Sequence, residues 1–382
     1  MIKNYFLLFL VFLLAGCQQK KTVATNANQD SIQKYLDLAD NDSLDFDKRI
    51  AYNDMAFEAA VKENNTEKNR ELLSKIGFKY YSLNSLDKYE KTYKQLLKVT
   101  YNFKDSINYG NALRMKAFHL YLKKQNDSSL FYYLKAEKIY QSIDKPREYS
   151  IVLFNKGLIL FDIGDYNACE YTLIKALHYI EKTDDKKFQF GILNQLGVLY
   201  SELNEKDKAL FYHLKAFNIL KINKIDDKKI LQSSCYNNIG FVYLKKKEYK
   251  KAILNFNLGL KNDNLKNLDP ELYALLYDNL GYSLLKNGNY EKALKFFQKA
   301  LEVKKEIKYL PVLINIYTHF SEYYRSVKHF DLAIFYSELA LKEARNSKVY
   351  PDVLLALKSN MLADNKKIKP NLEEYIQIYD SI

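Results

Sequence analysis

The sequence predicts an all-α solenoid of about seven to eight antiparallel helix pairs, and two spacings indicate it. A small residue returns about every 40 positions, with spacings of 40, 40, 40, 43, 41 and 40 residues between Gly77, Ala117, Gly157, Gly197, Gly240, Gly281 and Ser321. A second core-type position follows twelve residues after each of these, at Tyr89, Ser129, Cys169, Ala209, Ala252, Ala293 and Ala333. One unit copied at a fixed period of this length is typical of a solenoid.

Each unit reads as two helices. The residues at i, i+4 and i+7, counted from the second core-type position, share one face of a helix, as Ala252, Phe256 and Gly259 do. The earlier pair Gly281 and Leu284, spaced i and i+3, shares a face of another helix. Small residues at the crossing let the two backbones approach closely, and we expect large side chains such as Phe256 to fill the space around it.

Glycines and prolines mark the helix ends. Gly164 and Gly288 lie in polar turns between the two helices, where a helix C-terminus favours a left-handed residue. Proline is tolerated in the first turn of a helix, and all five prolines fall at predicted helix starts. These are Pro146, Pro270, Pro311, Pro351 and Pro370, with Asp269 as the predicted N-cap before Pro270.

One copy combines Leu280-Gly281, Gly288-Asn289-Tyr290, Ala293, Phe297 and Ala300. This pattern resembles the tetratricopeptide repeat (TPR) family, and the resemblance extends from about residue 31 to the C-terminus, although the first unit matches poorly. It implies a right-handed superhelix whose first helices line the concave side. The long period is similar to that of the repeats in kinesin light chains and bacterial peptide-pheromone receptors.

The N-terminus predicts export and lipid anchoring. Lys3 precedes an apolar run, Tyr5 to Leu14, which is too short to span a bilayer and is typical of a signal peptide. The following Leu14-Ala15-Gly16-Cys17 resembles the lipobox of bacterial lipoproteins, which implies acylation of Cys17. More than one acyl chain gives stable anchoring. We expect a lipoprotein in the cell envelope of a Gram-negative bacterium, facing the periplasm or the cell surface.

These features predict three segments. Residues 1–16 form the signal peptide, residues 17–30 a polar tether after the lipidated cysteine, and residues 31–382 a TPR solenoid that ends in a terminal helix. No linker rich in Gly, Pro or Ser interrupts the repeats. The two remaining cysteines, Cys169 and Cys235, are expected to be buried small side chains and not a disulfide.

No pattern in the sequence indicates catalysis or a cofactor. The five histidines form no H-x-x-x-H pair, and there is no C-x-x-C, G-x-S-x-G or phosphate-binding glycine loop. His213 is expected to pack in the core. The formal charge of +13 is spread along the repeats, which favours a solvated basic surface over nucleic-acid binding, with weak attraction to anionic lipid or polymer as the alternative. We therefore expect a protein that is not an enzyme and needs no metal or cofactor.

A ligand site is expected on the outward face of the first helices. Amides there offer a donor and an acceptor together, which suits an extended peptide backbone. They equally suit bonds between neighbouring helices, and both roles remain open. The candidate groove residues precede the small residue of each unit, with one arginine at the far end: Asn155, Asn194, Gln195, Asn237, Asn238, Asp278, Asn279, His319 and Arg325.

The leading hypothesis is an exported, lipid-anchored scaffold whose concave groove binds a peptide or a segment of a partner protein, with no small-molecule substrate. A sensor module, shortened relative to TPR regulators, is the alternative. A glycan-capturing lipoprotein is the third possibility, and it fits less well because the chain lacks Trp and its aromatics keep helical spacing.

Overall fold

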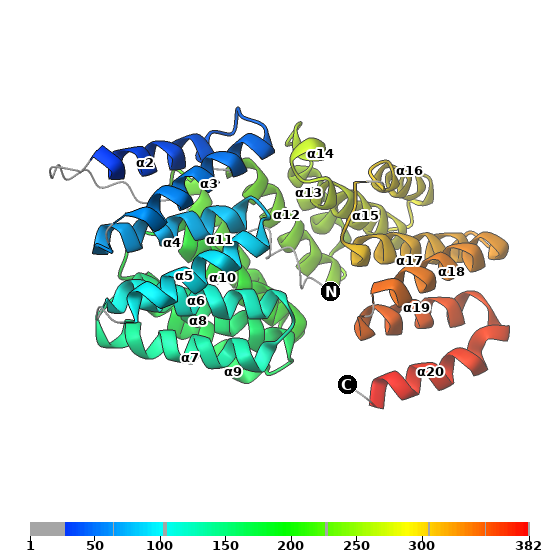
Figure 1. Ribbon diagram of the computed structural model, residues 1–382. Coiled ribbons are helices and arrows are strands. Elements are labelled where there is room, and N and C mark those ends of the chain that lie inside the picture. The colour runs from blue at the N-terminus through cyan, green and yellow to red at the C-terminus, as the bar shows by residue number, and fades with distance from the viewer. Residues whose placement is uncertain are drawn as a thin grey trace. The chain divides into compact units, whose positions relative to one another are not determined.

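The computed structural model describes residues 27–380 apart from 64, 102–104, 226–227, 305 and 348. The predicted signal peptide and Cys17 lie outside the described residues. Within them, every element of regular secondary structure is helical, from α2 to α20 (Figure 1), which confirms the all-α prediction. Contacts divide the chain into two compact units that meet between Leu199 and Tyr200, inside α10, and each unit is described by itself.

The N-terminal unit consists of successive helix hairpins (Figure 1). In chain order these are α2 (Ala27–Asp40) with α3 (Phe46–Lys62), α4 (Glu67–Ser82) with α5 (Leu86–Thr100), α6 (Ser106–Leu122) with α7 (Asn126–Ser142), and α8 (Pro146–Asp162) with α9 (Tyr166–Ile180), followed by most of α10 (Lys186–Glu202).

The C-terminal unit repeats the arrangement. After the end of α10 come α11 (Lys206–Ile222), α12 (Lys228–Lys245) with α13 (Tyr249–Gly259), the short α14 (Leu265–Leu268), α15 (Pro270–Lys286) with α16 (Tyr290–Leu301), α17 (Leu310–Ser326) with α18 (Phe330–Ser347), and α19 (Tyr350–Ala363) with the 3-10 turn η1 (Asn365–Lys367) and α20 (Ile368–Asp380). The last hairpin, α19–α20, occupies the stretch where a terminal helix was predicted.

The two helices of a hairpin cross at the small residue, as the spacing predicted. A Cβ added to Gly240 would lie 2.7 Å from Phe256, and one added to Gly281 would lie 2.8 Å from Phe297. At Gly157 the equivalent neighbour is Leu173, at 2.7 Å. Real Cβ atoms do not approach other atoms this closely, so the packing of each large side chain requires a small residue opposite it. The second core-type position, twelve residues after the small one, is fully buried in every copy: Tyr89, Ser129, Cys169, Ala209, Ala252, Ala293 and Ala333.

The turn between the two helices is a Schellman motif in several repeats. After α8, the Asp165 N–H donates to the Leu160 carbonyl at 2.9 Å, and the Gly164 N–H donates to the Phe161 carbonyl. Gly164 and Gly288 have φ of 85° and 82°, which confirms the predicted left-handed conformation. In other repeats a residue with a Cβ adopts it: Asn84, Lys124, Asn204, Lys247 and Lys328.

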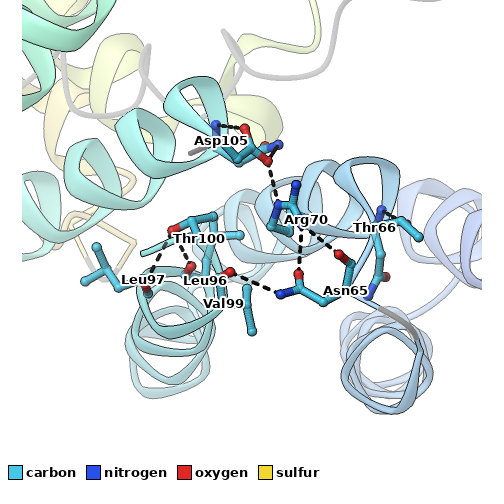
Figure 2. Close-up of polar contacts among 10 residues, drawn as sticks. Asn65, Thr66, Arg70, Leu96, Leu97, Val99, Thr100 and Asp105 are labelled. Carbon is cyan, nitrogen blue, oxygen red and sulfur yellow. Dashed lines mark hydrogen bonds and ion pairs between the residues drawn. The ribbon is translucent and has the colours of Figure 1, made fainter. Parts of the chain in front are cut away.

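A buried ion pair joins the starts of two consecutive first helices in the N-terminal unit (Figure 2). Arg70 in the first turn of α4 donates from Nε to Oδ2 of Asp105 at 2.6 Å, and Asp105 caps the N-terminus of α6. The Arg70 Nη1 also donates to the Asn65 carbonyl at 2.7 Å, while Asn65 Nδ2 donates to the Val99 carbonyl at 3.1 Å. These bonds fix the stagger between neighbouring hairpins.

Polar bonds between the starts of consecutive first helices also occur further along the chain. Arg147 in the first turn of α8 donates to Asp185, the residue before α10, at 2.8 Å, and the Phe188 N–H donates to Asp185 in turn. In the C-terminal unit, Glu271 in the first turn of α15 accepts from the backbone N–H groups just before α17, at 3.1 and 3.0 Å. The partners are 35 to 38 residues apart, close to one repeat.

The environment of Asp105 stabilises its charged form. Burial raises its pKa, but the hydrogen bonds from Asn108 and Arg70 outweigh burial, so the pKa of Asp105 is lower than the ordinary value of 3.8. A group with a depressed folded-state pKa contributes stability that is complete above its unfolded-state pKa. That contribution is lost as the pH falls through the lower folded-state pKa.

The left-handed turns give a paired stability prediction. Lys247→Gly relieves about 1 to 2 kcal/mol of steric strain at φ 61°, and the greater freedom of glycine in the unfolded chain subtracts about 0.5 to 1 kcal/mol. We expect a net gain of roughly 0.5 to 1 kcal/mol. Gly288→Ala at the equivalent turn is expected to lose about 1 kcal/mol. Urea unfolding of both variants measures this, and changes of the same sign would contradict the assignment of these turns.

The Arg70–Asp105 pair gives a second prediction. Arg70→Ala leaves a carboxylate that is 4% exposed without its cation, and we expect a loss of about 3 to 5 kcal/mol in the free energy of unfolding. Arg147→Ala is the matched control, because the side chains of Arg147 and its partner Asp185 are 30% and 18% exposed, and we expect a loss of about 1 kcal/mol there. The difference between wild type and Arg70→Ala should shrink as the pH falls below 3.8. Equal losses in the two variants would refute a special role for burial.

Candidate functional site

The structure places the predicted groove residues on first helices and buries most of them. Asn155 lies on α8, and Asn194 and Gln195 lie on α10; their exposed fractions are 6, 7 and 3%. The Asn155 Oδ1 atom has no hydrogen-bond partner among the described residues. Asn194 does take part in an interaction, so it is not a free amide.

In the C-terminal unit, three amides form a chain between α12 and α15. Asn279 Nδ2 donates to Asn237 Oδ1 at 3.0 Å, and Asn237 Nδ2 donates to Asn238 Oδ1 at 3.4 Å. All three side chains are at most 6% exposed. The amides therefore join neighbouring helices, which is one of the two roles left open by the sequence. Their contact with a peptide stays a prediction.

A carboxylate and a histidine make the next link, between α15 and α17. Asp278 is fully buried, and its Oδ2 atom lies 2.8 Å from His319 Nδ1. The imidazole stacks on the Tyr282 ring, with centroids 4.0 Å apart and an interplanar angle of 15°. Asp278 Oδ1 has no partner among the described residues. The pair fixes the orientation of His319, which also lines a cavity.

The cavity lies among the first helices α15, α17 and α19 and has a volume of about 240 Å³. Its lining includes the predicted residues His319 and Arg325. Within the described part of the chain, no carboxylate pairs with Arg325 or with Lys358. The complete lining is Tyr282, Asn315, Thr318, His319, Ser321, Glu322, Arg325, Leu355, Lys358, Ser359 and Leu362.

Glu322 is the acidic group of this lining, and it is already engaged. Lys286 forms an ion pair with it, and Tyr282 Oη donates to it at 3.2 Å. Burial raises the pKa of Glu322, but the bond from Lys286 and its charge outweigh burial and lower it. Burial, followed by the Glu322 charge, raises the pKa of Tyr282 to about 12. The cavity thus presents donors and two cations to a ligand, while its carboxylate is neutralised by its own neighbours.

The structure brings His319 and Arg325 to one cavity, with Asp278 directly behind, and leaves the α12–α15 amides in a separate chain. Sequence reasoning missed the contribution of α19, namely Lys358 and Ser359. The small residue that identifies the first helix of each repeat is absent there, because Met361 lies 40 residues after Ser321, where a small residue would be expected. The position of Pro351 near the start of a helix was the remaining signal for a first helix.

The residues set aside in the sequence as packing groups are indeed buried. His213 is fully buried, which lowers its pKa to about 3 and keeps the imidazole neutral. Cys169 and Cys235 are free and buried, and burial raises the pKa of the Cys169 thiol to about 12. The aromatics after the small residue pack across repeats, as where Tyr81 meets Phe118 edge to face at 4.8 Å.

The described residues contain no group of three or more His, Cys, Asp or Glu placed to hold a metal ion. None of the helices that the structure describes combines the length and the apolar character needed to cross a membrane.

Comparison with known families identifies part of the array. Two family models, both described as tetratricopeptide repeat, match residues 233–264 and 272–345. These stretches cover most of α12 with α13, and α15 through most of α18. The chain therefore contains TPR repeats where the sequence pattern was clearest. No curated protein matches the chain in sequence.

Solved structures share the fold. The apo form of RapI is 15% identical with a TM-score of 0.70, over 93% of this chain and 99% of that one. The apo form of the quorum sensor NprR from B. thuringiensis is 15% identical with a TM-score of 0.64, over 92% and 96%. The Rap conjugation gene regulator of plasmid pLS20, in complex with the Phr* peptide, is 13% identical with a TM-score of 0.58, over 94% and 97%. At these identities the likeness concerns the fold alone.

Proposed function

We propose that the C-terminal unit binds a segment of a peptide or of a partner protein against the first helices α15, α17 and α19, and that the protein acts as a scaffold. The observation that carries the proposal is the cavity in which Arg325 and Lys358 lack a carboxylate partner among the described residues. The carboxylate of the same lining, Glu322, is already bonded by Lys286 and by Tyr282. A half-buried guanidinium beside oriented polar groups favours a ligand that brings acceptors.

The chemistry of the lining suits a peptide. Thr318, Ser359 and Asn315 combine donors with acceptors, as an extended backbone requires, and Leu355 and Leu362 supply apolar contact. A cavity of about 240 Å³ accommodates only part of a peptide, so the rest of the segment would lie outside it.

The structural neighbours support the same class of ligand without assigning it. One of them is in complex with the Phr* peptide, and another is a quorum sensor. Both descriptions equally favour the second candidate, a sensor module in which the bound peptide is the signal. A glycan-capturing role has less support, because Tyr282, the phenol ring at the cavity, belongs to a helix and is stacked on His319.

Location in the cell envelope is part of the proposal. It rests on the apolar run Tyr5 to Leu14 and on the lipobox that ends at Cys17. Acyl chains on Cys17 would hold the solenoid at a membrane surface through the tether at residues 17–30, leaving the repeats free to bind a partner in the envelope.

The binding proposal is tested with a degenerate heptapeptide library passed over the immobilised protein, with retained peptides identified by mass spectrometry. Arg325→Ala should weaken the retained peptides roughly tenfold, which corresponds to about 1.4 kcal/mol, the cost of a lost bond to a charged group. Its melting temperature should stay unchanged, because Arg325 has no ion-pair partner among the described residues.

Two further variants sharpen this test. Arg345→Ala also removes one arginine charge, but from the exposed ion pair between Arg345 on α18 and Glu374 on α20, so it should not alter retention. Asn238→Ala with Asn279→Ala interrupts the buried amide chain and should lower the melting temperature. Retention that is equal in wild type and Arg325→Ala would count against the cavity as the binding site.

Anchoring is tested separately through Cys17. Cys17→Ser removes the thiol that would be acylated, so the protein should leave the membrane fraction or keep its unprocessed N-terminus. Membrane fractionation and mass determination of the N-terminal peptide measure both effects. A variant that remains membrane-bound with the mature N-terminus would exclude lipid anchoring at this position.

A further inference from the structure

A second cleft lies in the N-terminal unit, away from the proposed peptide site. It is formed by the end of α5 together with α6 and α7, and it has a volume of about 540 Å³. Three lysines and three tyrosines dominate its lining, with two leucines beside them: Lys98, Lys116, Lys135, Tyr101, Tyr109, Tyr132, Leu97 and Leu113. Among the described residues, no acidic side chain belongs to the lining.

Aromatic rings lie against the ammonium groups of two of these lysines. Lys116 Nζ donates to Tyr132 Oη at 2.6 Å and lies 4.0 Å from the centroid of the same ring. Lys135 Nζ lies 4.3 Å from the centroid of Phe131 and 5.8 Å from that of Tyr132. Such cation–π contacts orient an ammonium group but do not neutralise its charge.

The three lysines lack carboxylate partners within the described residues. Some other lysines of the same unit do have such a partner: Lys88 pairs with Asp54 at 2.6 Å, and Lys156 pairs with Glu137 at 2.5 Å. Glu137, the carboxylate on α7 beside Lys135 and Lys138, is occupied by Lys156 and Lys175. Like charges gathered in a concave, partly aromatic site repel one another and concentrate a positive potential there.

From this geometry we infer that the α5–α6–α7 cleft is a second interaction site, which takes an acidic segment of a partner protein, with carboxylates on the three lysines and apolar or aromatic groups on the tyrosines. Tyr101 is 76% exposed and the neighbouring Phe131 is 50% exposed, so both offer apolar area to such a segment. The inference does not depend on the cavity of the C-terminal unit.

The shape of the site favours a chain segment over a lipid surface. Lys116 is half-buried and lies against Tyr132, so its ammonium group is reached from within the cleft. A flat anionic membrane contacts protruding side chains, whereas a carboxylate on a flexible segment can also follow the open cleft to Lys116.

The probe for the test is a dye-labelled peptide of alternating Glu and Val, titrated with the full-length protein and followed by fluorescence anisotropy. We expect binding that weakens as the salt concentration rises from about 0.05 M to about 0.5 M. The double variant Lys98→Glu with Lys135→Glu should bind roughly tenfold more weakly, because both side chains are exposed and their reversal repels the probe.

Lys138→Glu is the matched control. It lies one turn further along α7, is exposed and does not line the cleft, so it should change affinity less than about twofold. Lys116→Gln provides a second variant that removes one charge without reversal and should give an intermediate loss. Circular dichroism melting checks that every variant is folded.

Three outcomes would overturn the inference. The first is that the wild type does not bind the acidic peptide, and the second is that Lys138→Glu loses as much affinity as the double variant. The third is that the wild type binds phosphatidylglycerol vesicles but not the peptide, and that the double variant no longer binds the vesicles. The last result would assign the cleft to an anionic lipid surface. Loss of peptide binding here, with heptapeptide retention unchanged in the same variant, separates this site from the cavity near Arg325.

Discussion

The close approach of the two helices within each hairpin is the constraint on which the other features depend. At Gly240 and Gly281 a single added carbon would lie within 2.8 Å of a phenylalanine ring. The opposing positions on the second helices, such as Ala252 and Ala293, are fully buried. A crossing this tight leaves little freedom in how far apart the two helices of a hairpin lie or how they are staggered.

The junctions between hairpins carry this register forward through polar bonds. Arg70 with Asp105, and Glu271 with the start of α17, connect positions about one repeat apart. Asn237 with Asn279, and Asp278 with His319, do the same near the middle of the first helices. Pairing offsets the cost of burying these polar groups, and it favours one arrangement of neighbours.

Unpaired positive charge and a concave surface coincide at the two candidate binding sites. Many lysines have a carboxylate within ion-pair distance, as Lys88 does with Asp54. Among the described residues the cations Arg325 and Lys358 at one cavity, and Lys98, Lys116 and Lys135 at one cleft, do not. A concave site with uncompensated positive charge gains from an anionic or acceptor-rich ligand, because that ligand removes a repulsion that the folded protein retains.

The sequence by itself determined the repeat, the helix crossings, the capping glycines and the helix-start prolines, because these follow from local sterics and from a period that one chain displays. It also indicated His319 and Arg325 as groove residues. It did not indicate Lys358 on α19, because Met361 occupies the position where the repeat would have a small residue. It also did not indicate the cleft formed by Lys98, Lys116 and Lys135, which lie on three different helices. Only the tertiary structure decided which polar groups are already paired, since pairing between residues about 40 positions apart depends on the stagger of neighbouring hairpins.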